Sequence, residues 1–247
     1  MNRRWTSKQE WRPTRHPRTN IGVLRDDGLV VVDHFLSAEE VASARAEING
    51  LSPTFEPSAN TILGVRKDLV GWVKSRSDVG EDGSSASASL GLPPGPNLQQ
   101  ILRRLESLIF ELNASSESGL QDLLLPCQAM IGSYQEGGFF SPHKDNELCQ
   151  DGSKNWTKPR EVTAVLYINV GEEWASERGG CLKCYLGADG RADRVQNVQP
   201  HGGRLVLFKS RELLHEVTKI NVKPGSPCLP RLALTLWAVK HMHTKRL

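Results

Sequence analysis

The sequence lacks the features that define several protein classes. No apolar run approaches the ~18–20 residues that a membrane-spanning helix needs. Residues 1–20 contain no apolar segment like that of a secretory signal peptide. Five cysteines are an odd number, which argues against a secreted disulfide framework and favours reduced thiols. We therefore expect a soluble protein of the cytoplasm, with the nucleus as the alternative location and no membrane partner.

Charge is close to balanced except at the N-terminus. The 247 residues carry a net charge of +3, and residues 1–20 alone contribute +5. Such a segment could contact nucleic acid or anionic lipid. It is also acid-poor, like an organelle transit peptide, but it has no amphipathic stripe. Because chain ends are usually loose, we predict that residues 1–20 form a disordered, basic tail.

The first half of the remaining chain predicts one strand and two helices. Residues 28–35 are rich in β-branched side chains, which favours a strand. Ser37 and Glu40 have the spacing of a capping box, and this predicts a helix that begins there and ends at Gly50. A second helix is expected to begin at Asn97, with Gln100 three residues later. Its apolar residues recur at i, i+3, i+4 and i+7.

The segment between these two helices has a different composition. Residues 76–96 are rich in Ser, Gly and Pro and have little to bury, which predicts a mobile surface loop.

The second half of the chain has the pattern of a β-protein. Short apolar or alternating runs are separated by turn residues, which is typical of a sandwich or barrel. We predict a single α+β domain over 21–240, in which residues 21–125 pack on a β-core formed by 126–240. The eight predicted strands are 126–134, 139–145, 161–170, 181–186, 194–199, 203–209, 214–220 and 231–239.

Three residues of this half form a candidate metal site. His143 and Asp145 alternate along a predicted strand, so both side chains point to one face. His215 follows 72 residues later at the start of another strand. Two imidazoles and one carboxylate are the set used by non-haem Fe(II) oxygenases, whereas a structural zinc site needs more thiolates or a fourth ligand. The alternative is a surface turn, because Ser-Pro precedes His143 and Asn-Glu follows Asp145.

A second candidate site lies on the last predicted strand. Alternation places Arg231, Ala233, Thr235 and Trp237 on one face, and the intervening leucines on the other. An arginine beside Thr and Trp can hold a carboxylate with two hydrogen bonds. The alternative is an edge-strand arginine in solvent.

Tyrosine and cysteine add less specific candidates. Tyr134 and Tyr167 are two of only three tyrosines, and each is either a site residue or plain core filling. Cys181 and Cys184 form a single CxxC, which we interpret as buried free thiols.

The order of these motifs resembles the 2-oxoglutarate/Fe(II) oxygenases of the prolyl 4-hydroxylase type, nearest the cytosolic hypoxia-sensing branch. The likeness spans roughly residues 25–240. It is carried by Gly28–Leu36, Arg66-Lys-Asp68 with Trp72, Ser133-Tyr134, Pro142-His143-Lys-Asp145-Asn146, Leu166-Tyr167-Ile-Asn169, Gly179-Gly-Cys-Leu182, Gly203–Phe208, His215-Glu-Val217 and Arg231–Trp237.

The resemblance implies a double-stranded β-helix, or jelly roll, that holds Fe(II) on His143, Asp145 and His215. It implies that 2-oxoglutarate binds through its distal carboxylate. The residues that the resemblance assigns to this cosubstrate are Arg231, Tyr167, Thr235, Leu182 and, at the metal end, Tyr134. It further implies O2 as oxidant, ascorbate as reductant, a proline-containing protein or peptide as substrate, and a monomer.

One spacing departs from the family. The basic residue usually follows the distal histidine by about nine or ten positions, whereas Arg231 follows His215 by 16. Lys223, eight positions after His215, is therefore a rival. We prefer Arg231, because Lys223 precedes a Pro-Gly turn, while Arg231 begins an alternating strand.

Three other functions remain as alternatives. The substrate could instead be free proline or another small molecule. A nucleic-acid demethylase would usually carry a second arginine six positions after the first, and this sequence has Trp237 there. A non-catalytic binding module would be expected to have lost part of its ligand set, and this chain retains the whole set.

Overall fold

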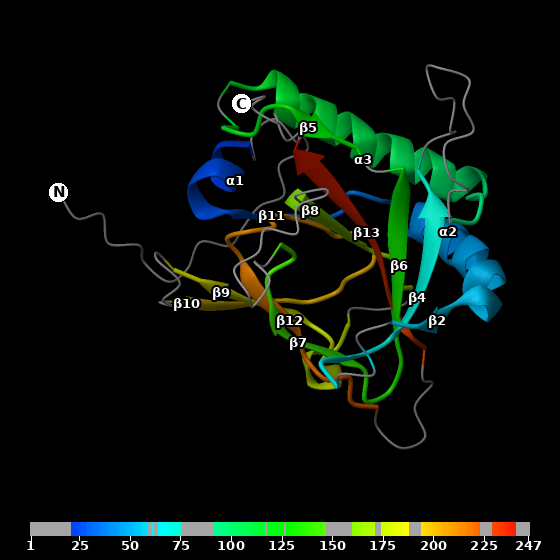
Figure 1. Cartoon of the computed structure of the whole chain (residues 1–247). Helices are drawn as coiled ribbons and strands as arrows, with labels where there is room; N and C mark the ends of the chain where they lie inside the picture. The colour runs from blue at the N-terminus through cyan, green and yellow to red at the C-terminus, as the bar shows by residue number, and fades with distance from the viewer. Residues whose placement is uncertain are drawn as a thin grey trace, which may run out of the picture.

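The computed structural model describes residues 21–58, 61, 64–75, 91–116, 118–125, 127–146, 160–170, 174–187, 194–222 and 229–240. The tail predicted at 1–20 and most of the loop predicted at 76–96 lie outside these residues. The described chain is an antiparallel β-sandwich with three helices (Figure 1). The predicted jelly-roll α+β fold is confirmed.

The larger sheet contains strands from both halves of the chain. The central strand β13 (Arg231–Lys240) pairs with β8 (Arg160–Tyr167) along seven residues and with β6 (Gln128–Tyr134) along five, so both of its edges are hydrogen-bonded. In spatial order the sheet contains β1 (Leu29–Val32), β11 (Leu205–Lys209), β8 (Arg160–Tyr167), the central β13 (Arg231–Lys240), β6 (Gln128–Tyr134), β4 (Leu69–Lys74) and β2 (Glu56–Pro57), with β5 (Leu123–Leu124) paired to β13.

The smaller sheet faces the first and contains five strands. Their order is β10 (Arg194–Val198), β9 (Leu182–Leu186), β12 (Leu214–Val217), β7 (Phe139–His143) and β3 (Arg66–Lys67).

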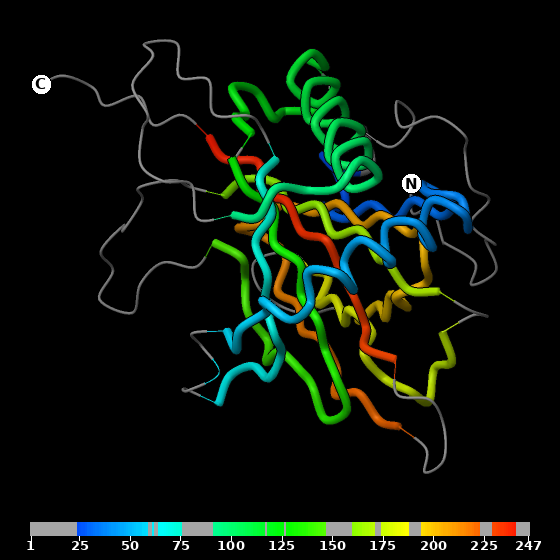
Figure 2. Tube along the Cα trace, turned by 90° about the vertical axis from the view of Figure 1, so that its right-hand side faces the viewer, coloured from blue at the N-terminus to red at the C-terminus, as the bar shows by residue number. Residues whose placement is uncertain are grey.

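The helices pack on the outer face of the larger sheet (Figure 2). They are α1 (Ile21–Asp27), α2 (Ala38–Leu51) and α3 (Pro96–Ala114). The apolar stripe of α3, which includes Leu98, Leu105 and Leu112, is buried as its spacing predicts. None of the described helices combines the length and hydropathy needed to cross a membrane.

Strand β13 separates two cores by the alternation predicted from the sequence. Leu232, Leu234 and Leu236 belong to the core shared with the helices. Ala233 belongs to the core between the sheets, together with Tyr167 and residues of β9. The face that carries Arg231 therefore points into the sandwich.

The eight predicted C-terminal strands are all present, but some boundaries differ. Strand β7 ends at His143, and Asp145 lies in the turn that follows. Helix α2 has the predicted capping box, but it continues through Gly50 to Leu51.

Helix α3 also begins differently from the prediction. Its N-cap is Gly95, and the backbone amides of Asn97 and Leu98 donate to the Glu47 carboxylate of α2 at 2.8 and 2.9 Å. A carboxylate from another helix thus replaces the expected local cap, and Gln100 has no capping role in it.

Candidate active site

The two predicted histidines face each other across neighbouring strands. His143 ends β7, His215 lies in β12, and the strand register pairs the two residues directly. Residues opposite each other in an antiparallel pair point to the same side. Their imidazole centroids are accordingly 4.3 Å apart.

Backbone carbonyls set the tautomer of both rings. The Nδ1 atom of His143 lies 2.7 Å from the Ser141 oxygen, and Nδ1 of His215 lies 3.1 Å from the Leu213 oxygen. A carbonyl oxygen can only accept, so each Nδ1 carries the proton and each neutral ring keeps its Nε2 lone pair. Both Nε2 atoms face Oδ1 of Asp145, at 3.4 and 3.8 Å.

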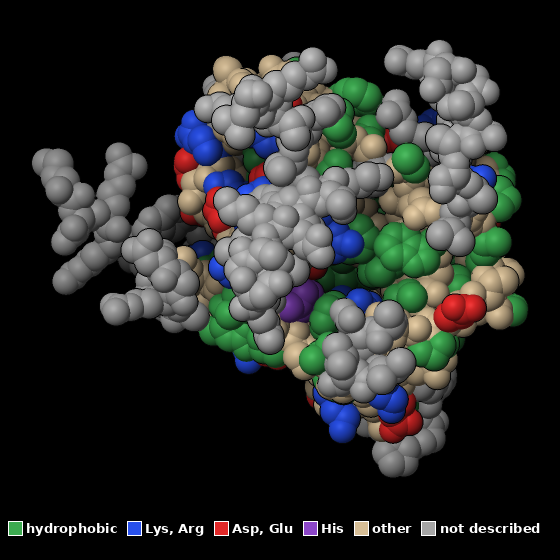
Figure 3. Space-filling view, in the orientation of Figure 1, with side chains coloured by type: hydrophobic (Ala, Val, Ile, Leu, Met, Phe, Trp, Pro, Cys, Tyr) green, Lys and Arg blue, Asp and Glu red, His purple; other side chains and the backbone are tan. Residues whose placement is uncertain are grey.

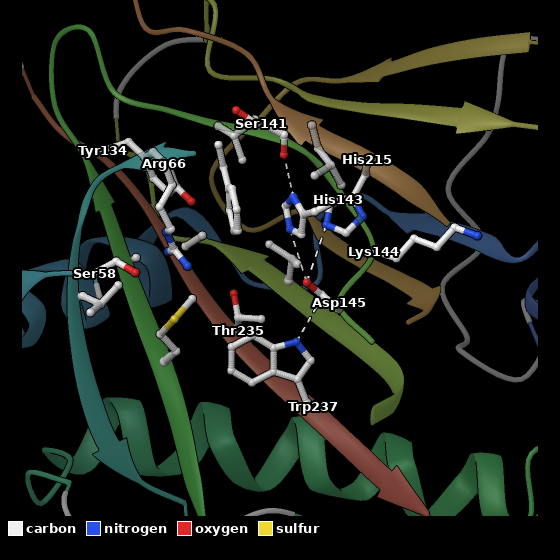
Figure 4. Close-up of a pocket in the computed structure, with 18 of the residues that line it drawn as sticks. Ser58, Arg66, Tyr134, Ser141, His143, Lys144, Asp145, His215, Thr235 and Trp237 are labelled. Atoms are coloured by element: carbon white, nitrogen blue, oxygen red, sulfur yellow. Dashed lines mark hydrogen bonds and ion pairs between the residues drawn. The ribbon is translucent and has the colours of Figure 1, made fainter. Parts of the chain in front are cut away.

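Asp145 completes a three-residue cluster between the sheets (Figure 4). One ligand atom from each of His143, Asp145 and His215 lies within 4.8 Å of the others. Burial raises the pKa of Asp145, but His143 and His215, when their imidazoles are protonated, and the hydrogen bond from Thr163 outweigh it and hold that pKa below its usual range. Two imidazole nitrogens and one carboxylate fit Fe(II) and leave coordination positions open.

Aromatic rings fix both imidazoles from the side. Phe140 stacks on His143 with centroids 3.6 Å apart, and Phe208 tilts against His215 at 4.7 Å. The Arg66 guanidinium lies over the Phe140 ring, 4.3 Å from its centroid. Arg66 is itself held by Asp68, to which its Nε donates at 2.7 Å. The histidines therefore have little freedom to leave the cluster.

The cluster opens into a cavity of about 600 Å³. The cavity extends from Trp72, which is 36% exposed, to Arg231, which is 2% exposed. In Figure 3 a histidine is visible near the centre of the face, between apolar and basic side chains. His143 and Asp145 are thus partly exposed at the cavity, with side chains 16% and 10% exposed, while His215 and Arg231 are buried.

Arg231 is a buried cation with unused donors. Its Nε donates to the Gly180 oxygen at 2.7 Å, and it forms no salt bridge within the described part of the chain. Gly180 has φ +68°, and a Cβ there would lie 3.2 Å from Cδ of Arg231, so glycine is required at this point. A buried charge needs a counterion, and an anion in the cavity would supply it.

Two tyrosines flank the Arg231 guanidinium. Tyr134 is opposite Arg231 in the β13–β6 register, and the guanidinium lies 4.9 Å from its ring and 5.0 Å from that of Tyr167. The Tyr167 hydroxyl is buried and has no hydrogen-bond partner in the described structure. Burial raises its pKa to about 12, so it remains a donor at neutral pH. Burial likewise raises the pKa of Tyr134.

Two further residues predicted for the site, Thr235 and Leu182, line the wall of this cavity. Lys223 lies outside the described residues. Cys181 and Cys184 are buried free thiols, as predicted, and burial raises the pKa of Cys184 to about 12.

The cavity mouth also contains Trp72 and Arg160, which were not predicted as site residues, beside the predicted Trp237. The Trp72 and Trp237 rings are 6.1 Å apart, and the Arg160 guanidinium lies 3.9 Å from the Trp237 ring. Thr163, deeper inside, donates to Asp145. Thr163 lies four residues before Tyr167 and shares its strand face, but this spacing alone does not distinguish it from other hydroxyl residues.

Comparison with known proteins agrees with this geometry. Residues 129–239 match the family model of the 2OG-Fe(II) oxygenase superfamily. A prolyl-4-hydroxylase from Pseudomonas putida is 26% identical, with a TM-score of 0.66 over 92% of this chain and 100% of that one.

Two further solved structures are similar in fold. One is a prolyl hydroxylase from Trichoplax adhaerens in complex with a hypoxia inducible factor peptide fragment, at 21% identity and TM-score 0.65 over 91% of this chain and 89% of that one. The other is SnoN, an alpha ketoglutarate dependent epimerase of nogalamycin biosynthesis. It is 18% identical, with a TM-score of 0.58 over 91% of this chain and 82% of that one. The fold therefore serves more than one reaction.

The fold, the buried arginine and the His-Asp-His cluster together define a mononuclear non-haem iron oxygenase. Residues 129–239 are a domain of the 2OG-Fe(II) oxygenase type, and the chain is a 2-oxoglutarate-dependent dioxygenase similar to prolyl 4-hydroxylases.

Proposed function

We propose that this dioxygenase hydroxylates a prolyl residue of a peptide or protein, with release of succinate and CO2. The observation that carries the proposal is the arrangement of one cavity, in which an accessible metal-ligand cluster and an unpaired buried arginine share the same walls.

In this proposal Fe(II) would be held by the Nε2 atoms of His143 and His215 and by one carboxylate oxygen of Asp145. The support is the orientation of both rings, since each Nδ1 is committed to a backbone carbonyl. The metal charge, one carboxylate, the 2-oxoglutarate dianion and one arginine add to neutrality. A neutral assembly reduces the cost of burying charge in the sandwich.

Arg231 and the Tyr167 hydroxyl would bind the distal carboxylate of 2-oxoglutarate. Both are buried polar groups that lack an acidic partner among the described residues. Thr235 and Leu182 would line the same pocket, and Tyr134 would lie toward the metal end. Fe(II), when bound, would activate O2, which is the oxidant. One oxygen atom of O2 would enter succinate as 2-oxoglutarate loses CO2, and the other would be inserted into a substrate C–H bond.

The chain's own residues would orient the substrate and exclude water. Trp72 and Trp237 offer an apolar, aromatic surface at the cavity mouth, where a proline ring can pack. The Trichoplax structure, which holds a peptide, supports a peptide substrate. Ascorbate as reductant belongs to the proposal, and the cytoplasmic location and monomeric state stay predictions.

The test uses mass spectrometry of peptides after reaction. The protein is incubated with Fe(II), 2-oxoglutarate and O2, and with a panel of proline-containing peptides, each beside a copy in which proline is replaced by alanine. Free proline forms a separate reaction. The proposal expects the mass gain of one oxygen atom, located on proline, only in the parent peptides.

Two controls make the result specific. The His143→Ala variant should give no oxidised peptide. Oxidation of free proline alone, or of a residue other than proline, would contradict the peptidyl-proline assignment.

A further inference from the structure

The two oxygens of Asp145 have different environments. Oδ1 faces the Nε2 atoms of both histidines at 3.4 and 3.8 Å. Oδ2 accepts two hydrogen bonds, one from Nε1 of Trp237 at 3.0 Å (Figure 4) and one from Oγ1 of Thr163 at 2.7 Å. One oxygen is left for a metal, and the other is occupied by the protein.

The direction of the hydrogen bonds can be derived from chemistry. The indole N–H of Trp237 can only donate, so Oδ2 of Asp145 acts as an acceptor. The Thr163 hydroxyl therefore donates its single proton to Asp145. The Ser210 hydroxyl, 2.8 Å from that of Thr163, must then be the donor of the second bond. The result is a relay in one direction, from Ser210 to Thr163 to Asp145.

Both hydroxyls are held rigidly. Thr163 and Ser210 are each 0% exposed, so water does not compete for their bonds. Ser210 is further fixed by its backbone, which donates to Glu161 at 2.9 Å and accepts from the amide of Asn146 at 3.3 Å. The relay thus links β8, the end of β11 and the turn that carries Asp145.

Trp237 is also held in place by its neighbours. Its ring lies between the Arg160 guanidinium at 3.9 Å and the Trp72 ring at 6.1 Å. An indole has a single donor, and here that donor is directed at Oδ2. Trp237 therefore donates a hydrogen bond to Asp145 in addition to forming part of the cavity wall.

The flexibility of the Asp145 side chain explains why its Oδ2 atom needs hydrogen bonds. The terminal torsion of aspartate is soft, so packing alone does not choose which oxygen faces the histidines. Asp145 also lies in a turn beyond the end of β7, where no ladder holds it.

We propose that Thr163, supported by Ser210, and Trp237 are positioning residues that hold Asp145 as a one-oxygen metal ligand. By occupying Oδ2 they keep it from taking a further coordination position, which the cosubstrate and O2 would need. The inference rests on the proposed metal site.

The first test measures binding of Mn(II) alone by calorimetry, together with thermal unfolding of the metal-free protein. Removal of an outer-shell partner typically weakens metal binding ~10–100-fold. We expect this loss for Thr163→Val and for Trp237→Phe, and a smaller loss for Ser210→Ala, which acts through Thr163. Thr163→Ser keeps the hydroxyl and should restore affinity.

Matched controls separate positioning from stability. Ser118→Ala removes a fully buried hydroxyl that bonds only to backbone near α3, and Trp174→Phe removes a buried indole donor to the Gly179 oxygen. Both should lower thermal stability without changing Mn(II) affinity.

A second readout is the visible spectrum of the Co(II)-loaded protein, which reports coordination number. Thr163→Val combined with Trp237→Phe should change it, because Oδ2 becomes free to coordinate. The inference is overturned if wild-type protein binds Mn(II) and these variants bind it equally well, or lose affinity no more than the two controls. Absence of Mn(II) binding by wild-type protein would instead overturn the proposed metal site itself.

Discussion

At the scale of single residues, Arg231 is the clearest sign of what the cavity is built to hold. Arg231 is 2% exposed and donates to one backbone oxygen, that of Gly180, within the described part of the chain, and two buried tyrosine rings flank its guanidinium. Desolvating a cation without a counterion is costly. The site is therefore complete only when an anion is bound.

Replacement of Arg231 tests this directly. Breaking one partner of a desolvated ion pair costs ~3–5 kcal/mol, so Arg231→Ala should weaken 2-oxoglutarate binding by at least about a hundredfold. Arg231→Lys should be intermediate, because an ammonium cannot form the two-pronged contact. Calorimetric titration with Mn(II) in place of iron measures both.

The control for this prediction is Lys223→Ala. The sequence predicts that Lys223 lies in a solvent-facing turn, where a lysine contributes ~1 kcal/mol or less, so the affinity should change by less than about threefold. If Lys223→Ala proves to be the variant that loses binding, Arg231 is not the carboxylate partner.

At the scale of elements, α2 and α3 are joined by a contact that replaces a local cap. Glu47 accepts from the Asn97 amide and side chain, both at 2.8 Å, and from the Leu98 amide at 2.9 Å. It satisfies donors that a helix N-terminus leaves unpaired, and its negative charge suits the helix dipole.

Glu47→Ala should lower the free energy of unfolding by ~1–2 kcal/mol. Glu47→Gln, which keeps one acceptor oxygen, should lose less. Chemical denaturation measures both values, with the exposed Glu56→Gln as a control that should stay near wild type. Mn(II) affinity should not change in any of the three. A loss of metal binding in Glu47→Ala would show that the helices influence the site.

The same elements show how far the sequence could lead. Alternation along β13 predicted correctly which side chains enter the sandwich, because period two is a local property of a strand. The turn position of Asp145 was missed. The sequence suggested that strand alternation brings Asp145 to the same side as His143, but a turn after β7 does this instead. The Glu47 cap was also missed, as it joins residues 50 positions apart. Strands β2, β3 and β5 have two residues each, which is too few for a pattern.

The candidate site shows the same division. His143, His215 and Arg231 could be predicted because each has a distinctive type on a patterned strand. Thr163 and Ser210 could not be singled out, since hydroxyl residues are common and only the fold brings these two within 2.8 Å of each other.

At the scale of the whole molecule, stability and chemistry lie on opposite faces of the larger sheet. The core shared with α2 and α3 contains the leucines of β13, whereas the side chains that face the smaller sheet line the cavity. The helices cover one face of the larger sheet (Figures 1 and 2). The cavity is lined by residues of its other face and of the smaller sheet. Polar site residues can therefore be changed with limited damage to the main core.

The most direct measurement of the central claim is conversion of 2-oxoglutarate to succinate and CO2 by the purified protein. We expect conversion that requires Fe(II) and O2 and stops when a chelator removes the metal. His143→Ala should abolish it while thermal unfolding stays close to wild type, because the ring is partly exposed and not part of the main core. Turnover by His143→Ala at the wild-type rate would contradict the account.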